Sequence, residues 1–90
     1  MSNDIIELKV RNHPGVMSHI TGLFARRAFN LEGILCGPLG DGSMSRMYLL
    51  VNRDKKFAQI IKNLEKLYDV LEVHIKKDFD HTVFRRLHEL

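Results

Sequence analysis

The sequence is poor in the residues and segments that build covalent, metal-bound or membrane-bound frameworks. Cys36 is the only cysteine, so no disulfide can form within the chain, and a lone cysteine offers no zinc or redox motif. No run of 18 apolar residues occurs, and the N-terminus lacks the apolar segment of a signal peptide. We therefore expect a cytoplasmic protein with no membrane partner.

Aromatic residues are few as well, at 8% of the chain, and the positive charge is not concentrated. The net charge is +3, but the basic pairs are dispersed and have acidic neighbours: Arg26–Arg27, Lys55–Lys56, Lys76–Lys77 and Arg85–Arg86. A nucleic-acid-binding domain more often gathers its charge in one stripe. RNA-recognition folds also stack bases on strand aromatics, and only Tyr48 is available. RNA binding therefore ranks third among the functions considered in this section, and we expect no nucleic-acid partner.

Residue constellations for catalysis or metal binding are also missing. The histidines have no cysteine or carboxylate beside them at ligand spacing: His13, His19, His74, His81 and His88. Ser18 and His19 are adjacent and would point apart on a helix, and nothing resembles a catalytic triad. Arg11 and Asn12 lie near the position of an acylphosphatase-like loop, but the phosphate-cradling pattern is missing. We expect no catalytic residue, no metal site and no cofactor in this chain.

Apolar periodicity divides the chain into six segments. Alternation predicts strands over residues 5–10, 31–38, 46–51 and 70–75, and helical spacing predicts a helix over residues 16–27. A second helix is expected after an Asp54 N-cap, with an apolar stripe of Phe57, Ile60, Ile61, Leu64 and Tyr68. Asn30 is expected to end the first helix in a left-handed conformation, and residues 39–43 to make a turn. Residues 82–90 would add a short helix.

This order of elements predicts an α+β fold. Right-handed crossovers bring the strands into a ferredoxin-like βαββαβ sandwich, with a four-stranded antiparallel sheet and two helices on one face. The strand order would be 4-1-3-2, so the strand over residues 31–38 lies at an exposed edge that another chain can pair with. A domain of 90 residues buries a limited share of its surface, so a second copy would add useful burial.

The turn between the first strand and the first helix is the most informative segment. It reads Asn12, His13, Pro14, Gly15, Val16 and Met17. Proline is favoured at the first helical position, and glycine leaves the backbone open to close approach. The free amides and the dipole of a helix start attract a negative group such as a carboxylate. The turn therefore favours a chain that senses a small anion or amino acid over one that transforms it.

Residues 10–17 (VRNHPGVM) and 22–34 (GLFARRAFNLEGI) closely resemble the ACT domain of the small regulatory subunits of acetohydroxyacid synthase, also called acetolactate synthase. The run looks like the short subunit of the valine-sensitive isozyme of enteric bacteria. The resemblance covers residues 5–76, so we expect an ACT domain over residues 1–77 and a C-terminal tail over residues 78–90. Longer members continue into a second domain, which we do not expect because the sequence stops at Leu90.

The resemblance implies a regulatory role. Such subunits bind the thiamine-diphosphate-dependent catalytic subunit, raise its activity and make it sensitive to feedback by valine. It also implies a homodimer, because ACT domains of the family pair side by side and bind effectors between copies. Thiamine diphosphate, Mg²⁺ and FAD would belong to the catalytic subunit, and none to this chain. The alternative is a stand-alone ACT module that senses an amino acid for another enzyme.

The resemblance also carries effector-binding positions onto this sequence: Asn12, Gly15, Val16 and Met17 from one copy, and Asn30 and Leu31 from the other. Asn12 would bond the polar end of the ligand, and the amides around Gly15 and Val16 would receive its carboxylate. Asn30 would bond the ammonium or carboxylate group. Met17 and Leu31 would line a pocket that suits a branched aliphatic side chain. His13 is assigned no contact.

The face of the sheet without helices is the expected docking surface. Alternation along the first and third strands places apolar and polar residues there: Ile5, Glu7, Lys9, Arg46, Tyr48 and Leu50. Apolar residues on an uncovered face suggest that a partner covers it. We expect the catalytic subunit or a second dimer to dock on Ile5, Lys9, Arg46, Tyr48 and Leu50.

Overall fold

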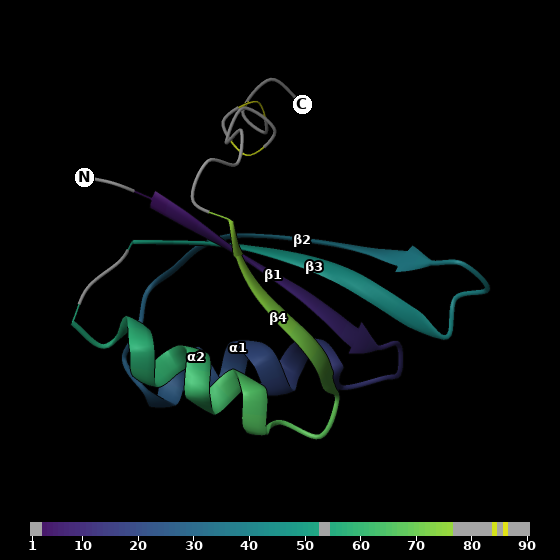
Figure 1. The fold of residues 1–90 in the computed structure, drawn as a ribbon, viewed down its shortest axis with the longest axis horizontal. Helices are drawn as coiled ribbons and strands as arrows, with labels where there is room; N and C mark the ends of the chain where they lie inside the picture. The colour runs from purple at the N-terminus through teal and green to yellow at the C-terminus, as the bar shows by residue number, and fades with distance from the viewer. Residues whose placement is uncertain (1–2, 53–54, 77–83, 85, 87–90) are drawn as a thin grey trace.

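The computed structural model describes residues 3–52, 55–76, 84 and 86. Six elements follow one another: β1 (Asn3–Arg11), α1 (Val16–Arg26), β2 (Leu31–Leu39), β3 (Met44–Asn52), α2 (Phe57–Lys66) and β4 (Val70–Lys76). The strands form one sheet in the order β2-β3-β1-β4, and α1 and α2 lie on the same side of it (Figure 1). The predicted α+β class, element order and strand order are confirmed.

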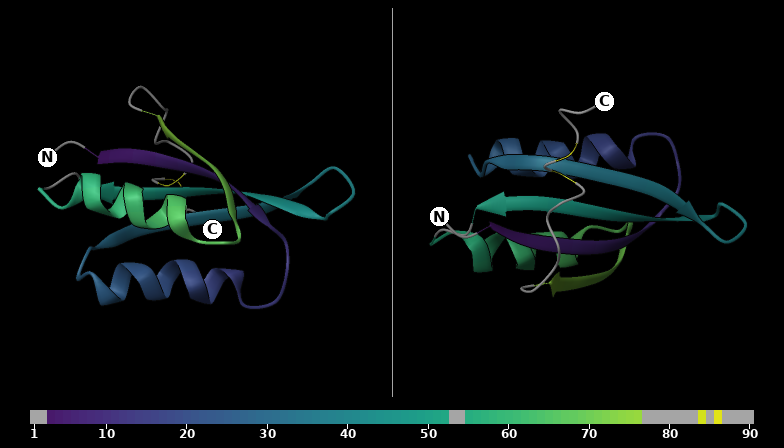
Figure 2. Two further views of the ribbon diagram at one scale, coloured as in Figure 1. Left: turned by 60° about the horizontal axis from the view of Figure 1, so that its bottom comes forward. Right: turned by 90° about the horizontal axis from the view of Figure 1, so that it is seen from above.

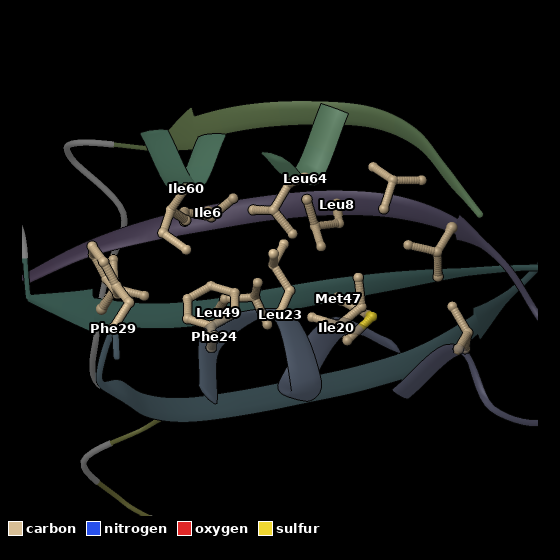
Figure 3. Packing of buried hydrophobic residues seen from close by; sticks show 14 of the residues in the cluster. Ile6, Leu8, Ile20, Leu23, Phe24, Phe29, Met47, Leu49, Ile60 and Leu64 are labelled. Carbon is tan, nitrogen blue, oxygen red and sulfur yellow. The ribbon is translucent and has the colours of Figure 1, made fainter. Parts of the chain in front are cut away.

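The core lies between the two helices and one face of the sheet. Ile6, Leu8 and Val10 of β1 stand opposite Leu49, Met47 and Ser45 of β3. The apolar residues among these pack against those of the helices: Val16, Ile20, Leu23 and Phe24 from α1, and Phe57, Ile60 and Leu64 from α2. Figure 3 labels Ile20, Leu23, Phe24, Ile60 and Leu64 in this packing. Burying one such side chain contributes about 1.5–3 kcal/mol, so the predicted apolar stripes account for most of the packing.

The predicted start of the first helix is confirmed, because α1 begins at Val16. Proline is favoured at the first helical position, but Pro14 precedes the helix and Gly15 is its N-cap. Gly15 has φ +94°, a left-handed conformation that glycine adopts without a steric penalty. Pro14 therefore lies in the turn before the helix, and Gly15 makes the change of direction.

The end of α1 corrects a prediction about its cap. The left-handed residue is Ala28, at φ +53°, and not Asn30. The amide of Phe29 donates to the carbonyl of Phe24 at 2.9 Å, and that of Ala28 donates to Ala25 at 3.1 Å, which is the Schellman pattern. Phe29 is buried with its ring edge-on to Phe24, at 5.7 Å between centroids. This packing requires the chain to turn directly after the helix, so it sets the position of the cap.

The predicted stripe of α2 is wrong at its last residue. Tyr68 lies beyond the helix and is 81% exposed, with the Arg11 guanidinium 4.9 Å from its ring centroid. Asn63 is buried instead, and its side-chain oxygen accepts from Gln59 at 3.1 Å. The N-cap position of α2 is Lys56, whose ammonium group donates to the carbonyls of Arg27 and Ala28. Asp54 lies outside the described residues.

The remaining expectations concern β4, the hairpin and the tail. Alternation predicts Leu71, Val73 and Ile75 on one apolar face of β4, but only Val73 of the three packs on the core. The register shifts between Lys9 and Val10 of β1. Leu71 and Ile75 are exposed on this edge strand. The turn over residues 39–43 is confirmed, with Gly40 and Gly42 at positive φ. The helix expected over residues 82–90 lies outside the described residues, apart from the single positions 84 and 86.

Candidate functional site

The loop of residues 12–17 is fastened to the β2–β3 turn by Asn12. Its backbone amide donates to the carbonyl of Ser43 at 3.0 Å, and its side-chain nitrogen donates to the carbonyl of Gly42 at 2.7 Å. The side chain is exposed. The bond to Gly42 uses one of the two hydrogens on Nδ2, so Asn12 can still donate one hydrogen bond through Nδ2 and accept through Oδ1. Asn12 can therefore bond either an ammonium or a carboxylate group of a ligand.

The helix start beside Asn12 leaves room at the backbone. A Cβ built on Gly15 would meet nothing within 4 Å. The amide of Val16 donates to the carbonyl of His13 at 3.3 Å, whereas the amides of Met17 and Ser18 lie in the first turn, where a helix provides no acceptor. The side chain of Val16 is buried in the core, and Met17 is 39% exposed. The loop therefore presents backbone donors and one apolar side chain to solvent.

The structure contains a polar cluster beneath this loop that the sequence analysis did not predict. Asp69, in the connection between α2 and β4, is only 8% exposed. One of its carboxylate oxygens lies 2.7 Å from Nε2 of His13, and the other lies 3.2 Å from Nδ1 of His19. The carbonyl of Asp69 also accepts from the amide of Arg11 at 2.9 Å. Asp69 therefore ties the end of β1, the loop and α1 together.

Electrostatics within this cluster follow from its geometry. The His13 pKa is raised above 6.5, chiefly because the Pro14 carbonyl accepts from its ring at 2.6 Å and then because of Asp69. The Asp69 pKa is lowered, mainly by the hydrogen bond from His13. The sequence prediction placed no carboxylate beside these histidines, and the structure corrects it, since Asp69 follows His19 by 50 residues. Within the described ranges, no group of three or more His, Cys, Asp or Glu is arranged to hold a metal ion.

The other two predicted effector positions lie at the far end of α1. A helix of 11 residues is about 16 Å long at 1.5 Å per residue, so one chain does not bring Asn30 and Leu31 to the 12–17 loop. Nδ2 of Asn30 donates to the Glu32 carboxylate at 2.8 Å, and Asn52 donates to the same oxygen at 2.8 Å. Leu31 is half-buried against the core. Both residues stand at the start of β2, which is an edge strand.

The helix-free face of the sheet, opposite α1 and α2 (Figure 2), carries the predicted docking residues in cross-strand pairs. Ile5 stands opposite Leu50, and Lys9 opposite Arg46. Tyr48 is half-buried, and its pKa is raised by burial and then by its hydrogen bond with Glu7.

Ile5 is 0% exposed on that face, so it is not accessible in this structure. Phe84 is buried and packs there against Gly33, which pairs with Leu50. A Cβ built on Gly33 would lie 2.8 Å from Cδ1 of Phe84. Lys9, Arg46, Tyr48 and Leu50 are the predicted docking residues that keep exposed surface on this face.

None of the helices in the described part of the chain is long and apolar enough to cross a membrane.

Comparison with known proteins gives consistent matches. The family model described as "AHAS small subunit-like ACT domain" matches residues 6–72. The acetolactate synthase isozyme 1 small subunit of Escherichia coli K12 is 53% identical over 85 residues, which cover 94% of this chain and 88% of that protein. The acetolactate synthase small subunit of Buchnera aphidicola is 38% identical over 82 residues, covering 90% of this chain and 52% of that protein.

A solved structure extends this likeness to three dimensions. The crystal structure of the acetolactate synthase small subunit from Thermotoga maritima superposes with a TM-score of 0.74 and 36% sequence identity. The match covers 83% of this chain and 47% of that one. The chain thus spans most of the E. coli relative and about half of the Buchnera and Thermotoga relatives.

Proposed function

Because the chain belongs to the family of acetolactate synthase small subunits and contains their ACT domain, we propose that it regulates an acetolactate synthase in the cytoplasm. It binds the thiamine-diphosphate-dependent catalytic subunit, raises its activity and makes it sensitive to feedback by a branched-chain amino acid, with valine as the first candidate. The observation that carries this proposal is the 53% identity to a small subunit across 94% of the chain. Thiamine diphosphate, Mg²⁺ and FAD remain with the catalytic subunit.

The proposed effector site lies between two copies of the chain. One copy supplies the 12–17 loop, and the other supplies Asn30 and Leu31 from the start of its β2. The edge position of β2 supports this pairing, because an exposed edge has free backbone groups for a second copy. The separation of the two halves along α1 fits a site that neither copy completes alone.

The available polar atoms indicate how an amino acid would be oriented. Nδ2 of Asn12 and Nδ2 of Asn30 each use one N–H within the chain, and the oxygen of each side chain can accept from the ligand ammonium. The amides of the first turn of α1 then receive the carboxylate, since a helix N-terminus favours negative charge. Met17, which is exposed, and Leu31, which is half-buried, supply apolar surface for a branched side chain.

Regulation follows if the effector binds one state of the assembly more tightly than the other, because only a difference in affinity can shift an equilibrium. We propose that the helix-free face docks the catalytic subunit through Lys9, Arg46, Tyr48 and Leu50. Tyr48→Lys, which places a cation opposite Glu7, should then abolish co-purification with the catalytic subunit while the melting temperature stays near that of the wild type. Unchanged co-purification would disprove this docking face.

The effector site is tested by thermal unfolding of the purified chain with each common amino acid. A ligand at 100 times its Kd stabilises by about 2.7 kcal/mol, and each kcal/mol raises the melting temperature of a small domain by roughly 4–8 °C. Valine should give such a shift, and Asn12→Ala and Asn30→Ala should remove it.

Asn52→Ala is the matched control, because Asn52 also bonds Glu32 but lies outside the proposed ligand contacts. A shift that survives Asn12→Ala and Asn30→Ala would place the ligand elsewhere. Co-purification of the catalytic subunit separates the proposal from a stand-alone sensing module, which would not retain it.

A further inference from the structure

Both ring nitrogens of His13 face groups that can only accept a hydrogen bond. Nδ1 lies 2.6 Å from the carbonyl oxygen of Pro14, and Nε2 lies 2.7 Å from a carboxylate oxygen of Asp69. A carbonyl and an ionised carboxylate have no hydrogen to donate. The ring can therefore satisfy both partners only when both nitrogens carry a proton. The geometry holds His13 as a positively charged imidazolium.

His19 is placed differently, because the Asp69 carboxylate faces one of its ring nitrogens. Only its Nδ1 meets Asp69, at 3.2 Å, and a neutral imidazole with its proton on that nitrogen satisfies the contact. The two rings are 6.2 Å apart, edge to face. Arg11, at the end of β1, is the other charged group that acts on His13, and it opposes the second proton.

The charge balance between His13 and Asp69 therefore depends on one proton. With His13 protonated, the cation cancels the charge of the Asp69 carboxylate. When His13 loses its proton, the carboxylate keeps its negative charge under the 12–17 loop and one of its hydrogen bonds is lost. A negative charge at this place repels an approaching carboxylate, and the low exposure of Asp69 limits screening by water and salt.

We propose that His13 is the charge-setting residue of the effector site: it neutralises Asp69 so that the 12–17 loop can accept the carboxylate of an amino acid. The proposal rests on the proposed function, because it takes the 12–17 loop as part of the effector site. It makes binding pH-dependent, since the ligand prefers the protonated form and its affinity falls as pH rises through the His13 pKa. That pKa is raised from 6.5, so the loss of affinity begins above pH 6.5.

Calorimetric titration of the full chain with valine between pH 6 and pH 8.5 tests this directly. The affinity of the wild type should fall about threefold to tenfold over this range, which corresponds to about half to one pKa unit of coupling. His13→Gln should bind weakly at every pH and show a flat profile, because the Asp69 charge is never cancelled. The double variant His13→Gln/Asp69→Asn should recover most of the lost affinity and keep the flat profile.

His74→Gln is the matched control. His74 also lies beside a carboxylate, with Nε2 3.1 Å from Glu72, but it stands on β4, away from the loop. This variant should keep the wild-type affinity and pH profile. The wild-type chain supplies a further test. The ring proton resonance of His13, followed as a function of pH, should titrate above pH 6.5.

The outcomes distinguish a failure of the proposed role of His13 from a failure of the proposed effector site. A flat profile for wild-type binding, a double variant as weak as His13→Gln, or a His13 titration below pH 6.5 overturns the role of His13 and leaves the effector site standing. An absence of binding by any branched-chain amino acid at any pH overturns the effector site and this proposal together.

Discussion

The contact between Gly33 and Phe84 yields the sharpest test of how the helix-free face is built. A methyl group added at Gly33 would lie 2.8 Å from Cδ1 of the Phe84 ring, closer than such carbon atoms approach in proteins, and 3.1 Å from Cε1, which is a tight contact. Gly37 lies on the same strand, and a methyl group there would meet nothing within 4 Å. The substitutions Gly33→Ala and Gly37→Ala are therefore chemically identical but differ in whether the ring is displaced.

The two substitutions are expected to change the free energy of unfolding in opposite directions. Replacing a strand glycine by alanine stabilises by roughly 0.5–1 kcal/mol when space is available, so Gly37→Ala should raise the free energy of unfolding. Overpacking costs about 1–3 kcal/mol, so Gly33→Ala should lower it by about 0.5–2 kcal/mol after the same gain is subtracted. Thermal unfolding resolves this, because each kcal/mol shifts the melting temperature of a domain of this size by roughly 4–8 °C.

A second variant, Phe84→Ala, identifies why Gly33→Ala loses stability. In Phe84→Ala the ring is gone, so adding Gly33→Ala should cost nothing further and should instead stabilise the chain as Gly37→Ala does. Such non-additivity is expected only for residues in contact. Equal melting temperatures for Gly33→Ala and Gly37→Ala, or a full cost of Gly33→Ala without the ring, would refute the packing of Phe84 on this strand.

Three further predictions concern the cluster, the cap and the core. The ion pair of Asp69 and His13 should stabilise most between about pH 3.8 and pH 6.5. The lowered Asp69 pKa means that its contribution is lost as pH falls below 3.8, and the raised His13 pKa means that its own is lost as pH rises above 6.5. Urea unfolding across pH should show both slopes weakened in Asp69→Asn, and unchanged slopes would contradict the pairing. Ala28→Gly should stabilise by up to about 1–2 kcal/mol, because the left-handed conformation is costly for alanine, and no gain in calorimetry would count against the Schellman cap. Phe24→Ala should cost about 3–5 kcal/mol and lower the melting temperature by roughly 12 °C or more, whereas a loss below about 1 kcal/mol would show that the core repacks.

Much of the fold could be predicted from local patterns. Alternation predicts a strand with one apolar face over residues 5–10, and helical spacing predicts a helix with one apolar stripe over residues 16–27. The buried residues of these segments include Ile6, Leu8 and Val10 of the strand, and Val16, Ile20, Leu23 and Phe24 of the helix. Once each segment has one apolar side, few arrangements bury all of them together, so the order of the strands followed as well. The candidate effector residues came from the resemblance to a family, and their contacts with a ligand remain predictions.

Positions that depend on distant partners were not predictable in this way. Tyr68 fits the helical stripe by spacing, but α2 ends at Lys66, so that side chain lies outside the core. Asn30 has the usual chemistry of a helix cap, yet the packing of Phe29 on Phe24 moved the left-handed residue to Ala28. Local propensities differ by about 1 kcal/mol or less between such residues, and the burial of a phenylalanine outweighs them.

The sequence by itself determined the elements, their apolar faces and the family, because periodicity and motifs are properties of neighbouring residues. Only the tertiary structure decided that Asp69 meets His13 and His19, and that Phe84 packs on Gly33. These contacts join residues about 50 positions apart, and their geometry depends on how the crossovers place whole elements. The charge beneath the 12–17 loop and the cover on the helix-free face are therefore consequences of the folded chain, and no short segment encodes them.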